Sequence, residues 1–122
     1  MAIEPGAGDL ERFRKNDDGR PVVMLQLLRF NEGGRERYLE FAAAAQPILL
    51  RIGASIVYAG ECLETLVPPT GQAWDGVLLV RYPTRTAYVD MLADPGYQAI
   101  APLRRAALQE AAVVRIDDWF AP

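Results

Sequence analysis

Histidine is absent from the 122-residue sequence, and this absence narrows the available chemistry. Without an imidazole, the chain cannot bind haem through histidine, build the usual zinc sites or form a Ser-His or Cys-His catalytic pair. Any general base must therefore be a carboxylate, a tyrosine, the single lysine Lys15 or the single cysteine Cys62. We expect neither a metal nor a cofactor.

Cysteine and long apolar runs are also scarce. Cys62 is the only cysteine, so no internal disulfide can form, which fits a reducing compartment. No segment approaches the roughly 20 apolar residues that cross a bilayer, and residues 1–20 lack the apolar stretch of a signal peptide. These features predict a cytoplasmic location and no membrane partner.

Charge of one sign does not dominate, because 13 basic and 16 acidic residues give a formal net charge of −3. This mixture provides no basic patch, so we expect no nucleic-acid partner. The length fits one domain, and a hydrophobic content of 51% is sufficient for a core. Arginine far outnumbers lysine and alanine is abundant, which favours a GC-rich bacterial genome.

Segments with strand and helix character follow a short lead-in. Runs of β-branched and aliphatic residues between turn signals predict strands, and apolar residues at three- and four-residue spacing predict helices. The predicted strands are Val22–Phe30, Ser55–Leu66, Trp74–Tyr82 and Ala111–Asp118. The predicted helices are Arg35–Ile52, a segment from Arg85 to the break at Asp94, and Tyr97 to about Glu110.

Capping and turn residues mark the ends of several elements. Asp9 is expected to cap a short helical turn over Leu10–Lys15, and Thr84 to cap the helix that begins near Arg85. Gly53 is expected to end the first long helix. The run Pro68-Pro69-Thr70-Gly71 predicts a loop.

The resulting order, β-α-β-β-α-β, is the split βαβ pattern of a ferredoxin-like sheet. We therefore predict an α+β fold in which the helices cover one face of a four-stranded antiparallel sheet. Residues 1–20 form a lead-in, residues 21–118 the domain, and residues 119–122 a tail.

The central strands are apolar on both faces, which a sheet covered on one side does not need. In the first strand, Val23, Leu25 and Leu27 face away from Val22, Met24 and Leu28. Monomers rarely expose an apolar patch of this size. We therefore predict a homodimer formed through the open sheet face. The alternative is that residues 1–20 fold over that face.

Several segments resemble a known bacterial family. They are Pro21–Phe30, Trp74-Asp75-Gly76-Val77, Arg81-Tyr82-Pro83-Thr84, Met91, Asp94-Pro95-Gly96-Tyr97-Gln98 and Arg104. Together they are similar to the domain-of-unknown-function 1330 family over roughly residues 21–118. The resemblance implies the dimeric α/β-barrel superfamily, in which two ferredoxin-like sheets pack face to face with a cavity beside each sheet. Related sequences carry asparagine where this chain has Gln26.

Arg104 is the first candidate for ligand binding. It follows Tyr97 by seven positions, which places it on or beside the apolar face of its helix. A guanidinium there would bind the carboxylate of a ligand. The structural alternatives are an ion pair with Asp75 or Asp117, or a side chain that extends to solvent.

Other candidates supply hydrogen bonds or aromatic surface. Tyr97 could act as a donor or general acid, and the alternative is a packing aromatic that anchors the start of its helix. Gln26 could hold a carbonyl group of a ligand, and the alternative is a core polar group whose hydrogen bonds are satisfied within the protein. Trp74, Tyr82 and Tyr58, with Tyr38, could line an apolar pocket, although such residues more often form core.

Acid–base candidates are weaker. Asp75, with Asp90 or Asp94, is the best carboxylate candidate for catalysis, after Tyr97. Asp117 and Asp118 are adjacent on a strand and face opposite ways, so they cannot act together. Cys62 has no base near it in the sequence and is expected to be structural.

Three functions remain open from the sequence. The first is a dimer that binds a small, partly apolar, anionic ligand in a cavity beside the sheet. The second is a cofactor-independent monooxygenase or isomerase acting on an aromatic or lactone substrate. The third is a purely structural or interaction module, since the fold alone does not select a function.

Overall fold

The strand Val22–Phe30 (β1) lies in the middle of a four-stranded sheet with the order β2-β3-β1-β4. The computed structural model describes residues 3–68, 70 and 73–121. The other strands are β2 (Ser55–Glu61), β3 (Gly76–Tyr82) and β4 (Leu108–Ile116), and every neighbouring pair is antiparallel. The predicted ferredoxin-like sheet is therefore confirmed.

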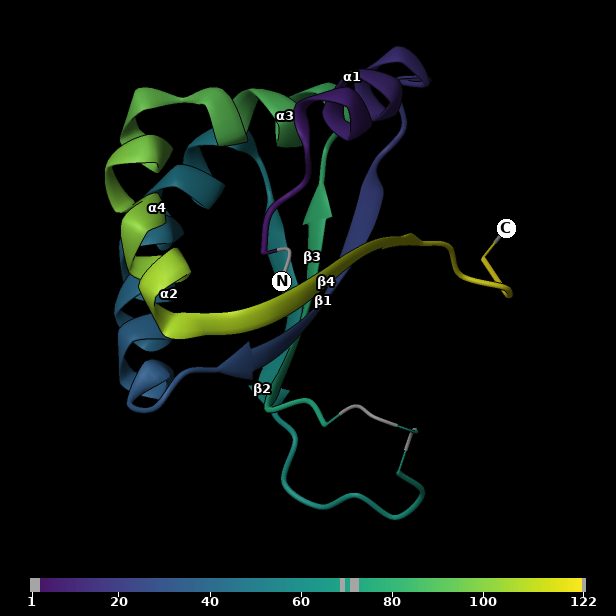
Figure 1. The fold of residues 1–122 in the computed structure, drawn as a ribbon. Helices are drawn as coiled ribbons and strands as arrows, with labels where there is room; N and C mark the ends of the chain where they lie inside the picture. Colours follow the sequence, from purple (N-terminus) through teal and green to yellow (C-terminus); the bar gives the residue numbers. More distant parts are fainter. Residues whose placement is uncertain (1–2, 69, 71–72, 122) are drawn as a thin grey trace.

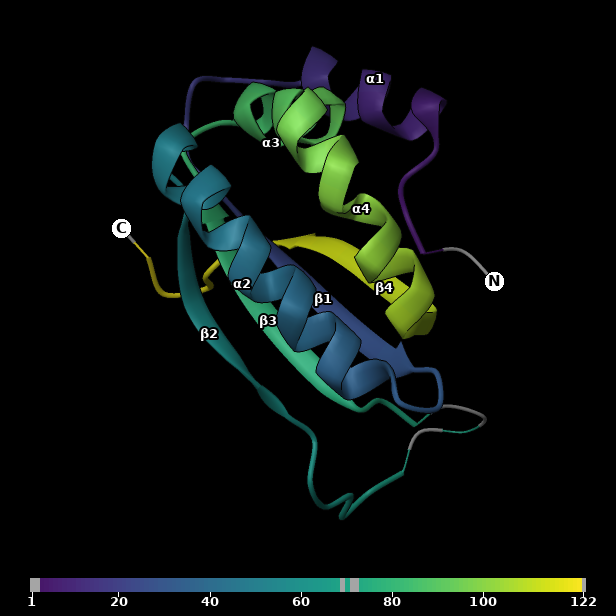
Figure 2. The same cartoon turned by 90° about the vertical axis from the view of Figure 1, so that its left-hand side faces the viewer.

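Three helices cover one face of this sheet, as Figures 1 and 2 show. They are α2 (Gly34–Ile52), α3 (Arg85–Ala93) and α4 (Pro95–Ala107). The core forms where their apolar stripes meet the sheet, because Tyr38, Phe41 and Ile48 of α2 pack over Met24 and Val80 of the sheet. The α2 helix continues through Pro47 and ends at Gly53, whose φ of 78° is the left-handed conformation that glycine favours.

The boundaries of three strands differ from the prediction, and β4 ends at Ile116 rather than Asp118. The β2 strand ends at Glu61 rather than Leu66, and β3 begins at Gly76 rather than Trp74. Leu63 and Leu66 are almost fully exposed, so this apolar run is not paired in the sheet of one chain. In the predicted loop that follows, Pro69 and Gly71 lie outside the described residues.

The helix α4 begins and ends earlier in the chain than predicted. The Asp94 carboxylate accepts hydrogen bonds from the backbone of Gly96 and Tyr97, so α4 begins at Pro95, two residues earlier than predicted. Its end is set by a distant residue, because the Asn31 backbone N–H donates to the Ala107 carbonyl at 2.8 Å. Leu108 then pairs with Phe30 and starts β4 three residues before the predicted Ala111.

The lead-in forms a helix, α1 (Ala7–Lys15), that packs against α3 (Figure 1). Its N-cap is Gly6, and the predicted cap Asp9 lies in the first turn. The Phe13 ring meets the Tyr88 ring edge to face at 5.8 Å, and the Asp17 carboxylate accepts from the Thr86 backbone N–H at 3.1 Å. The segment therefore lies on the helical side, and the alternative that it covers the open sheet face is wrong.

The opposite sheet face carries no helix in the described part of the chain (Figure 1). Leu25 lies at its centre, paired with Leu79 of β3 and Val114 of β4. Val114 is 46% exposed, and Tyr58 of β2, which pairs with Leu79, is 59% exposed. The face thus presents a continuous apolar surface. None of the helices in residues 3–68, 70 and 73–121 has the length and hydropathy to cross a membrane.

Candidate functional site

A cavity of about 370 Å³ lies between the sheet and the helices. Its walls come from every layer of the fold: Gln26, Leu78 and Tyr82 from the sheet, and side chains of all three covering helices. The N-terminal segment closes part of it, since Glu4, Pro5, Ala7, Leu10 and Glu11 also line the cavity. The lining is mainly apolar with a few polar groups, which is the usual character of a small-molecule site.

Arg104 is the positively charged residue of this cavity lining. Its side chain is buried, with only 5% exposure. One guanidinium nitrogen, Nη1, donates to the Ile3 carbonyl at 2.8 Å, and Nη2 donates to Gln26 Oε1 at 3.3 Å. Both acceptors are neutral, and among the described residues no carboxylate forms an ion pair with Arg104.

The structural alternatives for Arg104 are therefore wrong in this chain. Asp75 accepts instead from the Phe30 backbone N–H at 2.8 Å, and Asp117 pairs with Arg115 at 3.2 Å. The side chain does not extend to solvent. A buried guanidinium normally requires a counter-charge. The cavity thus holds a buried cation with which no described carboxylate forms an ion pair.

Four tyrosines surround this charge, and burial keeps their phenols protonated. Desolvation raises the pKa of Tyr38 to about 12 and that of Tyr88 to about 12, although the Arg104 charge opposes both increases. Burial also raises the pKa of Tyr82 and that of Tyr97, again against Arg104. All four phenols are therefore neutral hydrogen-bonding groups near neutral pH, and they add no charge to that of Arg104.

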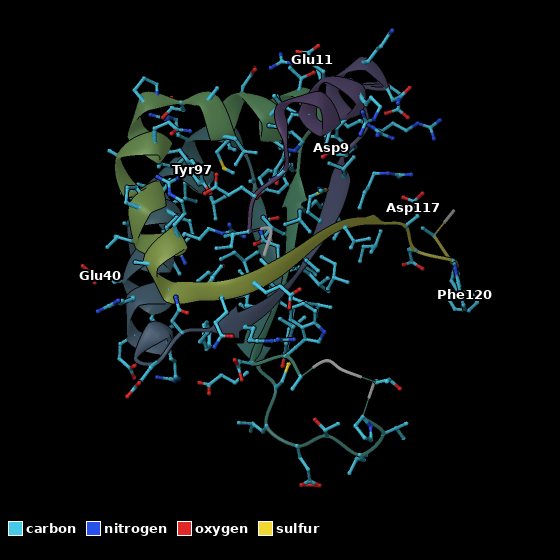
Figure 3. All side chains as sticks on the ribbon, viewed as in Figure 1. Asp9, Glu11, Glu40, Tyr97, Asp117 and Phe120 are labelled. Atoms are coloured by element: carbon cyan, nitrogen blue, oxygen red, sulfur yellow. The ribbon has the colours of Figure 1, made fainter. Side chains whose placement is uncertain are left out.

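The aromatic rings of the cavity lining form two groups of contacting rings. The Tyr82 and Tyr88 rings lie 4.9 Å apart at 70°, and the Phe41 and Tyr97 rings lie 6.0 Å apart at 86°. Tyr38 joins this set through Phe41, at a ring distance of 5.6 Å. Figure 3 shows Tyr97 on the helical side of the sheet, far from the C-terminal residues Asp117 and Phe120.

The structure brings together four of the six predicted ligand-binding residues: Arg104, Tyr97, Gln26 and Tyr82. Trp74 lies outside the cavity, where its ring packs against the Arg29 guanidinium at 5.5 Å. The register of the β2–β3 pair shifts between Ile56 and Tyr58, so Tyr58 pairs with Leu79. Because Leu79 faces the open side of the sheet, Tyr58 lies on that side as well.

The carboxylate candidates for catalysis also lie elsewhere. Asp75 connects the start of β3 to β1, and its backbone N–H donates to the Leu28 carbonyl at 2.7 Å. Asp90 forms an exposed ion pair with Arg14, and Asp94 caps α4. Cys62 is exposed. Across residues 3–68, 70 and 73–121, no cluster of acidic or cysteine side chains is arranged to hold a metal ion.

Several cavity residues were not predicted. Phe41 and Tyr88 belong to the apolar stripes of their helices, and such stripes usually signal core. The contribution of Glu4, Pro5 and Leu10 had no signal in the sequence, because it depends on how the N-terminal segment packs. Only the helical spacing of Tyr97 and Arg104 could have indicated a shared site.

The fold and the site together define a ferredoxin-like α+β protein with an aromatic cavity that contains a buried arginine, on the helical side of its sheet. The chain belongs to the family described as Domain of unknown function (DUF1330), whose model matches residues 27–117. No curated protein matches the chain.

Solved structures show the same architecture. A protein of unknown function from Rhodopseudomonas palustris is 28% identical, with a TM-score of 0.85 and coverage of 98% of each chain. A dimeric protein of unknown function with a ferredoxin-like fold from Bacteroides fragilis is 14% identical, with a TM-score of 0.56 over 80% of this chain and 96% of the other. A hydroxynitrile lyase from Passiflora edulis is 10% identical, with a TM-score of 0.64 over 85% and 99%. The last two similarities concern the fold alone, which does not select an activity.

Proposed function

We propose that the protein is a cytoplasmic, bacterial homodimer in which each cavity binds a small, largely apolar ligand carrying one carboxylate. The observation that carries this proposal is the buried Arg104, whose two hydrogen-bond acceptors are both neutral. An uncompensated buried cation is costly for folding, and a bound anion would offset that cost. A guanidinium also has the geometry to pair with both oxygens of a carboxylate.

The dimer part of the proposal rests on the open sheet face. Leu25, Leu79 and Val114 form its centre, and burying side chains of this size stabilises an interface by about 1.5–3 kcal/mol each. The B. fragilis protein with this fold is dimeric, which supports the proposal that two copies of this chain also form a dimer. The occupant of the face in this proposal is a second copy of the chain.

The protonation state of the cavity phenols favours ligand binding over acid–base catalysis as the function of this site. Tyr97, the best remaining catalytic candidate, has a raised pKa, so it is a hydrogen-bond donor and a poor base near neutral pH. Asp75, the other candidate, does not line the cavity. A monooxygenase or isomerase activity would have to use the phenols, the carboxylates of Glu4 and Glu11, or the ligand itself for proton transfer.

Calorimetric titration of the purified protein with benzoate and with benzamide tests the ligand proposal. Benzamide has nearly the same size but no charge, so we expect benzoate to bind and benzamide to bind at least about ten-fold more weakly. Arg104→Met should abolish the difference, because a thioether cannot bind a carboxylate.

Arg37→Met is the matched control, because Arg37 is exposed on α2 and does not line the cavity. This variant should bind benzoate as the parent protein does. Equal binding of benzoate and benzamide, or benzoate binding that survives Arg104→Met, would contradict the proposal.

A further inference from the structure

We infer that the ligand of this cavity is an aromatic monocarboxylate, whose carboxylate pairs with Arg104 and whose ring lies among the surrounding tyrosine and phenylalanine side chains. This inference rests on the proposed function and narrows it in two respects: the charge of the ligand and the nature of its apolar part.

The charge follows from the distribution of ionised groups along the cavity. Arg104 is the buried cation of the lining, and the phenols that line the same cavity are neutral. The carboxylate groups of the lining belong to Glu4 and Glu11, which come from the N-terminal segment. Glu4 is held at 3.0 Å by Arg105, and Glu11 is exposed. One ligand carboxylate would therefore meet a cation, whereas a second would face either apolar walls or these acidic side chains.

The donors around the carboxylate are already arranged. Arg104 uses Nη1 and Nη2 for the neutral acceptors Ile3 and Gln26, so a carboxylate can replace the weaker of these contacts without moving the guanidinium. Because Gln26 Oε1 faces Arg104, its amide nitrogen is the end of that side chain that can donate to a ligand.

The apolar part follows from the rings next to the guanidinium. Arg104 lines the same cavity as the four tyrosines Tyr38, Tyr82, Tyr88 and Tyr97. A group attached directly to the bound carboxylate must therefore lie among these rings. The wall rings meet one another at angles between 53° for Tyr38 with Phe41 and 86° for Phe41 with Tyr97. A flat ring can join such a cluster by edge-to-face contacts, whereas a puckered saturated ring gains only contact area.

The size of the cavity limits the number of rings. A volume of about 370 Å³ is near the lower end of the usual range for small-molecule sites, which begins at roughly 300 Å³. Acids with one or two rings fit this space.

A comparison of three ligands on the unmodified protein tests the inference. Benzoate and cyclohexanecarboxylate share charge and carbon number, and they differ in aromaticity. We expect benzoate to bind about five- to ten-fold more tightly, from one or two additional ring contacts. Terephthalate adds a second carboxylate, and we expect it to bind at least about ten-fold more weakly than benzoate.

A variant provides a second measurement. Phe41→Leu removes one wall ring and keeps Arg104, so it should reduce the preference for benzoate over cyclohexanecarboxylate while both ligands still bind. Leu39→Ala on the exposed side of the same helix is the control and should leave the preference unchanged.

The outcomes separate this inference from the proposed function. If benzoate and cyclohexanecarboxylate bind equally, and both lose binding in Arg104→Met, the anion site is correct and the aromatic class is wrong. If terephthalate binds as tightly as benzoate, the restriction to one carboxylate is wrong. If no carboxylate binds the unmodified protein, both the inference and the proposed function fail.

Discussion

Replacing Arg104 by methionine should separate a ligand-binding arginine from a structural one, because the two roles predict different stabilities. If Arg104 held the fold together through a buried ion pair, removing it would cost about 3–5 kcal/mol, since a partner charge would be left buried. The structure shows two neutral acceptors instead, the Ile3 carbonyl and Gln26 Oε1.

The expected magnitude follows from those two contacts. Hydrogen bonds from a charged donor contribute about 1.5–3 kcal/mol each, so their loss destabilises the folded state by roughly 3–6 kcal/mol. Removing the guanidinium also removes the desolvation cost of a buried cation, which is several kcal/mol and of opposite sign. We therefore expect the free energy of unfolding to change by less than about 2 kcal/mol.

Urea denaturation at one fixed protein concentration measures this change, because the stability of an associating protein depends on concentration. Arg37→Met should be within about 0.5 kcal/mol of the parent protein, as is usual for an exposed site. Saturating benzoate, at about 100 times its Kd, should stabilise the parent by about 2.7 kcal/mol and leave Arg104→Met unaffected. A loss of 3 kcal/mol or more in the ligand-free variant would show that Arg104 is structural and refute the reasoning.

Two further predictions concern association and alkaline pH. Leu25→Asp places a charge at the centre of the open sheet face, so the Kd of the dimer should rise at least about 100-fold. Light scattering should then give the mass of one 13.5-kDa chain, whereas Leu50→Asp on an exposed helix position should remain dimeric. A parent protein that is already monomeric would contradict the dimer. For alkaline pH, Tyr38 and Tyr88 have a pKa raised from 10.0 to about 12, so the folded state binds their protons more tightly than the unfolded state does. Their contribution to stability is complete below about pH 10 and is lost as pH rises to about 12, and phenolate absorbance in the folded protein should show this delay. Ionisation of all phenols near pH 10 before unfolding would contradict the buried cluster.

The sheet could be predicted from the sequence because its signals are local. Val22–Phe30 has a long apolar run with clear ends, and the structure confirms both boundaries. The start of β4 could not be predicted in this way. It depends on Asn31 and Phe30, which contact Ala107 and Leu108 across more than 70 intervening residues. Long-range hydrogen bonds of this kind decide where a helix ends when local propensity is ambiguous.

The same distinction explains what could be predicted of the site. The spacing of Tyr97 and Arg104 on one helix is a local feature, and it placed both side chains toward the core. The partner of Arg104 is the carbonyl of Ile3, 101 positions earlier, and a backbone carbonyl has no sequence signal. The position of Arg104 on its helix therefore predicted correctly that its charge needs a partner. The partners predicted from the sequence, Asp75 and Asp117, are wrong.

The neutral Ile3 carbonyl that accepts from Arg104 connects the stability of the fold to the proposed ligand binding. A carboxylate from the chain in the place of the Ile3 carbonyl would make Arg104 a stable ion pair and leave the cavity without an unmatched charge. The Ile3 carbonyl instead accepts a hydrogen bond from Arg104 Nη1 but carries no negative charge to pair with the guanidinium. Because the N-terminal segment supplies this carbonyl and also lines the cavity with Glu4 and Leu10, a ligand that pairs with Arg104 must compete with the segment or fit beside it. The affinity of the site for an anion therefore depends on how firmly α1 is held against α3, through contacts such as Phe13 with Tyr88.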